Sequence, residues 1–158
     1  MTGTAAALIA ESGVTLEPRD RLHDVAARAG LTVLAWRDAT AKRSACRALT
    51  TRYPEHEALL VTEVSMPVLD DAWHLILDRD VITIDEYLEL LTRAHPRLWI
   101  FDTTDAKVIA RAVRLAYLGS SVVLAVEGPD YCGALSQLAD APQSFELVEA
   151  LTTVVYVG

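Results

Sequence analysis

The chain has 158 residues, a length that predicts one compact domain. Hydrophobic residues make up 52% of it, which is enough apolar material to offset the entropy of folding and excludes a disordered chain. A formal net charge of -8 opposes general binding to nucleic acid, because neutralising phosphates requires clustered Lys and Arg. One local cluster, Lys42, Arg43, Arg47 and Arg52, is typical of the solvated face of a helix.

The sequence carries no targeting or membrane-spanning pattern. Residues 5–10 are apolar, but the run is short, lacks a preceding basic segment and is followed by Glu11. We therefore expect a cytoplasmic protein without membrane insertion. Cys46 and Cys132 have no CxxC or His-linked spacing, and the histidines have no metal spacing, so no zinc site, disulfide framework or other metal site is predicted.

Helix-like and strand-like runs alternate from Glu17 to the last residue. We expect strands at 31–35, 58–64, 73–77, 98–101, 121–126 and 153–157. Between them we expect helices from Pro18 to Gly30, at 42–52, from the Thr83 capping box to Pro96, from Asp105 to Gly119, at 131–139 and at 144–151.

This alternation predicts a single α/β domain over residues 1–158: a doubly wound, mainly parallel sheet with helices on both faces. Residues 1–14 are a candidate flexible N-terminus. In such a sheet, ligands bind where the strands run into loops at their carboxyl ends, so those loops are the candidate site.

The first of these loops lies in "LTVLAWRDATAKRSACRAL", residues 31–49, and has the layout of a phosphate-binding loop. The motif is G-x-x-x-x-G-K-[ST], in which the glycines admit phosphate to the backbone, the lysine meets its charge and the hydroxyl holds magnesium. Lys42 matches the lysine, but the two glycines are Trp36 and Ala41. Arg43 replaces the hydroxyl residue, and Ser44 stands one position late. The spacing alone is weak support for a nucleotide site.

The order of segments resembles the nucleotide-binding core of the type II secretion and type IV pilus motor ATPases, over residues 16–158. The resemblance implies a RecA-like P-loop NTPase fold. The matching segments are "LEPRDRLHDVAARAGLTVLA" for the helix and strand before the Walker A loop, "EALLVTEVSMP" for the Asp box, "TIDEYLELLTRAHPRLWIFDTTD" for the Walker B strand, "VIARAVRLAYLGSSVVLAVEGPDYCGALSQLADAP" for the His-box region, and "LVEALTTVVYVG" for the helix and strand that follow.

The resemblance also implies roles for individual residues. Lys42, Arg43 and Ser44 fall at nucleotide-binding positions, within a degenerate loop that includes Trp36, Ala39 and Ala41. Glu63 falls near the water-activating glutamate of the Asp box, Asp102 falls on the Walker B glutamate, and Asp105 falls on the acidic residue shortly after it. Glu127 takes the place of the His-box histidine and reverses the charge expected near a phosphate.

Side chains at the loop glycines restrict positive φ and block close approach of the backbone to phosphate, and Asp38 adds a negative charge inside the turn. The leading hypothesis is therefore a catalytically degenerate secretion or pilus ATPase-like domain that binds protein or regulates a motor ATPase, without a cofactor. Its expected partner is a motor ATPase, another pilus or secretion component, or a second copy of itself.

Two alternatives stay open. The first is a divergent but active ATPase that uses ATP and magnesium, with Lys42 on the phosphates and Glu63 and Asp102 as catalytic residues. The second is a small adaptor that uses the fold without nucleotide, since fold alone does not determine function. Trp36 is the residue that we suspect of being exposed or of filling the phosphate site.

Overall fold

A computed structural model describes residues 3–53, 57–63, 73–76, 85–86, 88–89, 93–139 and 144–158. Its centre is a seven-stranded sheet with the order β1-β7-β2-β6-β5-β3-β4, and every pairing in it is parallel. The strands are β1 (Thr15–Pro18), β2 (Gly30–Trp36), β3 (Ala58–Thr62), β4 (Trp73–Ile76), β5 (Leu98–Asp102), β6 (Ser121–Glu127) and β7 (Leu151–Tyr156).

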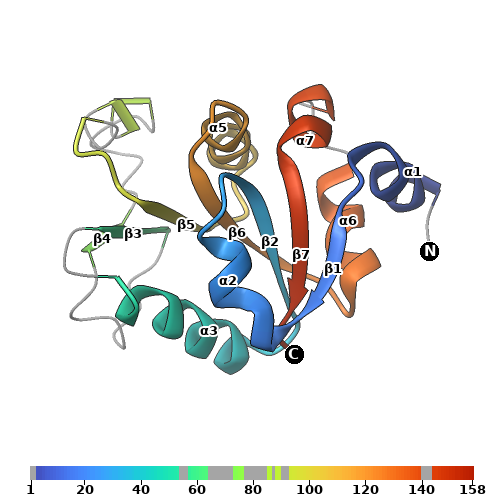
Figure 1. Ribbon diagram of the computed structural model, residues 1–158, viewed down its shortest axis with the longest axis horizontal. Helices are drawn as coiled ribbons and strands as arrows, with labels where there is room; N and C mark the ends of the chain where they lie inside the picture. Colours follow the sequence, from blue (N-terminus) through green and yellow to red (C-terminus); the bar gives the residue numbers. More distant parts are fainter. Residues whose placement is uncertain are drawn as a thin grey trace.

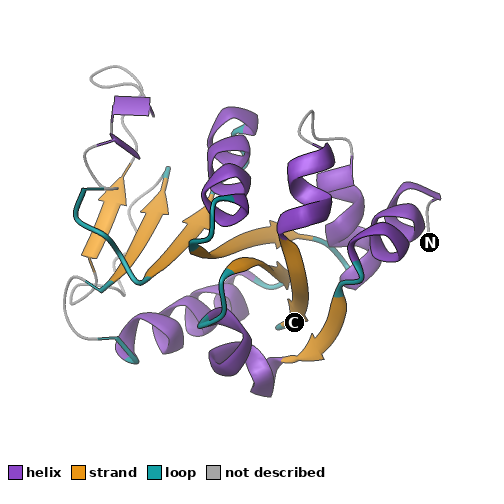
Figure 2. Ribbon diagram, turned by 45° about the horizontal axis from the view of Figure 1, so that its top comes forward, coloured by secondary structure: helices purple, strands orange, loops and turns teal. Residues whose placement is uncertain are grey.

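Helices cover both faces of this sheet (Figures 1 and 2). One face carries α2 (Leu22–Ala26) and α3 (Ala39–Thr51), and the other carries α1 (Gly3–Ser12), α5 (Ala106–Tyr117), α6 (Tyr131–Ala139) and α7 (Ser144–Ala150). Residues 85–86 and 88–89 are also helical, whereas Thr83 of the expected capping box lies outside the described residues. The predicted doubly wound α/β architecture is confirmed.

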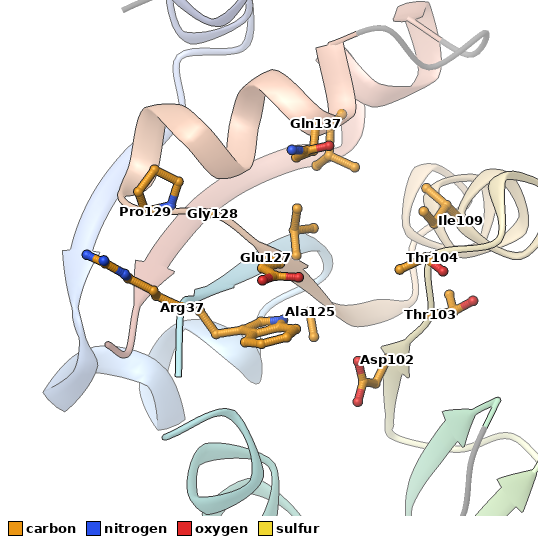
Figure 3. A pocket seen from close by; sticks show the side chains of 13 residues that line it. Arg37, Asp102, Thr103, Thr104, Ile109, Ala125, Glu127, Gly128, Pro129 and Gln137 are labelled. Carbon is orange, nitrogen blue, oxygen red and sulfur yellow. The ribbon is translucent and has the colours of Figure 1, made fainter. Parts of the chain in front are cut away.

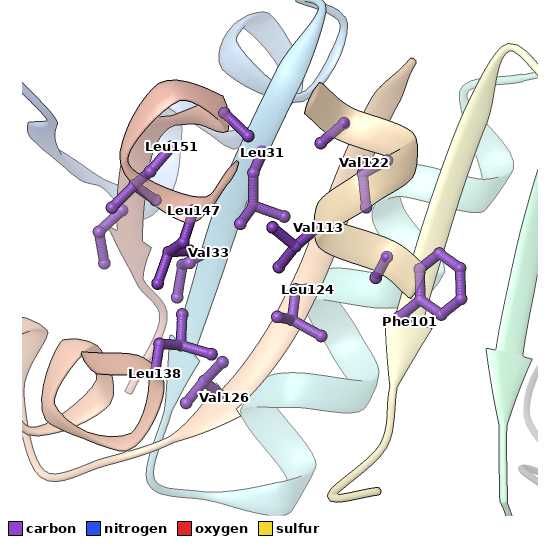
Figure 4. Packing of buried hydrophobic residues seen from close by; sticks show 14 of the residues in the cluster. Leu31, Val33, Phe101, Val113, Val122, Leu124, Val126, Leu138, Leu147 and Leu151 are labelled. Carbon is purple, nitrogen blue, oxygen red and sulfur yellow. The ribbon is translucent and has the colours of Figure 1, made fainter. Parts of the chain in front are cut away.

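The core has two layers because successive side chains of a strand point to opposite faces. Leu31 and Val33 of β2 pack with α5, α6 and α7 (Figure 4), whereas Leu34 packs on the other face with Cys46 and Leu49 of α3. The central strands β2 and β6 are buried along almost their whole length, which is typical of a parallel sheet covered on both sides.

The N-terminal third differs from the expected elements. Pro18 does not open a helix but ends β1, which pairs with β7 at the edge of the sheet. An edge strand tolerates proline because its missing N–H is not needed by a second neighbour. The helix that follows is shortened to α2, after a single 3₁₀ turn at Arg19–Arg21. Residues 3–12, within the candidate flexible N-terminus, form α1, whose Leu8 is buried in the core.

The topology creates a crevice at the carboxyl ends of the central strands. The helix after β2, α3, lies on one face, and the helix after the neighbouring β6, α6, lies on the other. Chains that leave adjacent strands in opposite directions open a gap between them, which is the usual ligand position in such sheets. The candidate site therefore lies beyond Trp36 and Glu127, the paired ends of these strands.

Gly30, the first residue of β2, is packed closely against the start of β7, and a substitution there measures how close this packing is. Its φ is +110°, and an added Cβ would lie 2.8 Å from Thr152 Cγ2 and 3.0 Å from the Ala150 carbonyl oxygen. Gly119 is a matched control, with a φ of +109° and nothing within 4 Å of an added Cβ. We expect Gly30→Ala to lower the free energy of unfolding by about 2–4 kcal/mol in urea titration, against about 1 kcal/mol for Gly119→Ala. Equal losses would contradict the close contact at Gly30.

Candidate functional site

A cavity of about 590 Å³ occupies this crevice. Its walls come from the carboxyl ends of β2, β5 and β6 and from α5 and α6 (Figure 3). The floor is apolar, with Ala125, Val126, Ile109 and Leu138 among its residues. The polar lining consists of Arg37, Asp102, Thr103, Thr104, Glu127 and Gln137. Trp36 also lines the cavity, and its buried Nε1 has no hydrogen-bond partner in the described part of the chain.

Lys42 and Asp102 form an ion pair beside this cavity. The Lys42 Nζ lies 2.9 Å from Asp102 Oδ2, and the two side chains are only 14% and 15% exposed. The same ammonium lies 4.2 Å from the centroid of the Trp36 ring, within the range of a cation–π interaction. Folding thus brings the expected Walker lysine against the expected Walker B carboxylate, and the lysine charge is neutralised inside the protein.

The turn between β2 and α3 is too short to form a phosphate cradle. Strand β2 ends at Trp36 and α3 begins at Ala39, so only Arg37 and Asp38 connect them. The N–H groups of Arg37 and Asp38 both donate to the carbonyl oxygen of Gly158, at 2.8 and 2.9 Å. Backbone amides that would face a phosphate in a glycine-rich loop are already satisfied by the chain itself.

Helix α3 begins three residues before the expected start at Lys42. The cause is Asp38, the N-cap residue, whose carboxylate accepts a hydrogen bond from the Thr40 N–H at 3.0 Å. A helix N-terminus attracts anions through its free N–H groups and its dipole. Here a side-chain carboxylate holds that position, which opposes the approach of a phosphate.

Glu63 and Asp102 meet at the same edge of the sheet, as the carboxyl ends of neighbouring strands must. The Thr103 hydroxyl donates to Glu63 Oε1 at 2.5 Å and accepts from the Asp105 N–H at 3.0 Å. Asp105 caps α5, with its carboxylate accepting from the N–H groups of Lys107 and Val108. The two catalytic candidates are therefore close together and held by the structure.

The other expected nucleotide-binding residues do not reach the cavity. Arg43 and Ser44 are exposed on the outer face of α3, where Ser44 Oγ accepts a hydrogen bond from Arg19 Nη2 at 3.0 Å. Ala39 and Ala41 are helical residues of α3, not loop residues. The cavity also contains residues that the sequence did not single out, such as Gln137, because no local pattern links α6 to the loop after β2.

Cys46 lies beneath the ion pair, on the inner face of α3. Burial, helped by the Asp102 carboxylate and partly offset by the Lys42 ammonium, raises the pKa of its thiol to about 12. The thiol therefore stays protonated at neutral pH. A neutral, buried thiol is a small packing residue here, without nucleophilic character.

Magnesium and a triphosphate fit this site poorly. Magnesium in a phosphate loop is held by the hydroxyl that follows the lysine, and here that residue is Arg43, directed outward. Within the described ranges, no three His, Cys, Asp or Glu side chains are arranged to hold a metal ion. The loop amides and the lysine are already paired, so no catalytic step through ATP is derived from this geometry.

Comparison with known proteins supports the fold. No protein-family model matches the sequence, and no curated protein is similar enough to count as a relative. Among solved structures, the chain is similar to the VirB11 ATPase of the Brucella suis type IV secretion system, crystallised in complex with sulphate, with a TM-score of 0.63 and 16% sequence identity. The match covers 99% of this chain and 52% of the VirB11 chain, so this chain spans about half the length of that ATPase.

The protein is thus an α/β domain with a seven-stranded parallel sheet, and its fold is similar to that of a secretion ATPase. The fold implied by the sequence resemblance is confirmed at this level. A search of the described helices found none that is both long enough and apolar enough to cross a membrane.

The strength of the Lys42–Asp102 pair is measurable by a double-mutant cycle with Lys42→Ala and Asp102→Ala. We expect a coupling free energy of about 1–3 kcal/mol in urea unfolding, because both groups are largely shielded from water. The matched control is the exposed Arg93–Glu89 pair, with side chains 74% and 72% exposed, for which about 0.3–0.5 kcal/mol is expected. If the two cycles give the same coupling free energy, Lys42 and Asp102 do not form a shielded ion pair in solution.

Proposed function

We propose that this protein is a catalytically degenerate secretion ATPase-like domain that acts by binding other proteins. One observation carries the proposal: the amides of the turn after β2 are bonded to Gly158, in the place where a phosphate would be bound. The Lys42–Asp102 pair and the Asp38 cap support it, because each removes a further group from phosphate recognition. The similarity in fold to a secretion ATPase supports the part of the proposal that relates this domain to such ATPases.

The proposed partner is a motor ATPase of a secretion or pilus system, or another component of such a system. A domain with the same fold can pack against the full-length enzyme where a subunit or domain of that enzyme would pack, without turnover of its own. The alternative partner is a second copy of this protein, bound through the same surfaces. We further propose a cytoplasmic location, where such ATPases meet their nucleotide.

A divergent active ATPase is the second candidate function. The proximity of Lys42 and Asp102, with Glu63 on the adjacent strand end, favours it, since these are the residue types that phosphoryl transfer requires. Activity would require the ion pair to separate and the turn after β2 to open. In this alternative Glu63 activates water, and Glu63→Gln abolishes turnover.

Calorimetric titration with ATP and magnesium separates the two functions. We expect no binding with a Kd below about 1 mM and no phosphate release above background, because the amides and the lysine are already paired. Lys42→Ala should behave like the native protein, and so should Lys107→Ala, which removes the only other lysine.

Micromolar binding together with turnover would contradict the proposal if Lys42→Ala abolished both and Lys107→Ala left both intact. Turnover that is lost in Glu63→Gln would then assign the protein to the active alternative. Turnover equal in native protein and in all three variants would point to a contaminating ATPase, and would leave the proposed absence of activity in place.

The regulatory role is testable with a purified type IV secretion or pilus motor ATPase. We expect the present protein to co-elute with that ATPase in gel filtration and to change its rate of ATP hydrolysis at equimolar concentration. The Gly30→Ala variant, weakened in its fold, serves as the control for effects of added protein. An ATPase that neither binds the protein nor changes its rate would favour an adaptor with an unrelated partner.

A further inference from the structure

Charge is divided unevenly between the two faces of the sheet. Residues 19–52 contain eight Lys and Arg and only three Asp, whereas the rest of the chain contains six Lys and Arg and 19 Asp and Glu. The formal charges are thus +5 for this segment and -13 for the remainder. Arg37, Asp38 and Lys42 of this segment lie at the crevice; the other six arginines and two Asp lie in or next to the 3₁₀ turn, α2 and α3, so the face that these helices cover is basic.

Three arginines of this face, Arg19, Arg43 and Arg47, are here called the α3 arginine patch. All three are exposed. Arg19 reaches α3 through its hydrogen bond to Ser44, which lies between the other two along the helix. Arg43 and Arg47 are one helical turn apart, so their side chains leave the same side of α3.

The patch arginines lack the partners that arginines have elsewhere on the molecule. Helix α3 contains no Asp or Glu, and no ion pair joins the patch to a carboxylate in the parts of the chain that are described. By contrast, the described arginines after residue 52 are each paired: Arg93 with Glu89, Arg97 with Glu57, Arg111 with Asp85, and Arg114 with Glu146.

This arrangement works against the helix that carries it. Like charges one turn apart repel each other. Carboxylates supplied from outside would relieve this repulsion. Such a surface favours association with a partner that carries complementary negative charge.

We propose that the α3 arginine patch binds a short acidic segment of a partner protein. The inference rests on the proposed protein-binding function and names the chemistry of the partner. A short segment is favoured because the remainder of the molecule is strongly acidic and repels a long polyanion that extends beyond the patch.

Nucleic acid and membrane surfaces fit the patch less well. Single-stranded nucleic acid is held by exposed aromatic side chains as well as by charge, and membrane surfaces are bound with help from apolar side chains. The large hydrophobic side chains that are exposed in the described structure are Leu16, Ile76, Tyr117, Leu118 and Phe145, and none of them lies in residues 19–52.

The test uses a fluorescein-labelled oligoglutamate peptide and fluorescence anisotropy on the full chain, at low salt and at about 0.15 M salt, where the Debye length is about 8 Å. We expect saturable binding that weakens with salt. Arg43→Glu with Arg47→Glu should weaken it by at least about tenfold. The matched control, Arg93→Glu with Lys107→Glu, makes the same change in net charge on other surfaces and should change the affinity by less than about twofold.

Absence of binding, or an equal loss in both double variants, would overturn the proposal. Tighter binding of an oligothymidine or of phosphatidylserine vesicles, lost in the same patch variant, would also overturn it and assign the patch to that ligand. If the charge-reversed variant fails to fold by circular dichroism, Arg43→Gln with Arg47→Gln is expected to show the weakening instead. None of the three patch arginines lines the cavity, so the ATP titration of the same variants reports on the proposed function separately.

Discussion

The contact on which the site depends is the one that closes the turn after β2. A glycine-rich loop leaves its amides free for phosphate, whereas here the N–H groups of Arg37 and Asp38 donate to Gly158. Once these amides are satisfied, α3 begins at once, capped by Asp38, and Lys42 is carried into its first turn. Its ammonium then lies between Asp102 and the Trp36 ring. Each of these contacts follows from the shortness of the turn.

The crevice at the carboxyl ends of the strands is present in this protein, and the groups that line it determine what it can bind. The strand order still places β6 beside β2 and sends their helices to opposite faces, so a cavity persists at the carboxyl ends. Its polar lining is of mixed charge, with Arg37 as well as Asp102 and Glu127. The exposed arginines Arg19, Arg43 and Arg47 lie away from the cavity, on the outer face of α3 around Ser44. The α3 arginine patch is therefore separate from the crevice.

Much of the fold was predictable because buried strands and capped helices leave local patterns. The apolar run at 121–126 became β6 with one residue added, and Asp105 caps α5 as its position indicated. Strand β1 was missed because it is short, mostly exposed and paired only with β7 at the far end of the chain. In the site, the resemblance implied roles for Lys42, Glu63 and Asp102, and the structure brings these residues to one edge of the sheet. The Gly158 contact left no local signal, because only the strand order brings that residue beside the turn.

The amides of the turn after β2 are closed off by their hydrogen bonds to Gly158. Amide hydrogen exchange of Arg37 and Asp38, followed by NMR, tests these bonds directly, because a hydrogen-bonded amide exchanges only when the structure opens. We expect slow exchange for both amides, comparable to that of neighbouring residues in β2 and unchanged by ATP with magnesium. Exchange as fast as in an open loop, with protection that develops only when ATP and magnesium are added, would contradict this expectation.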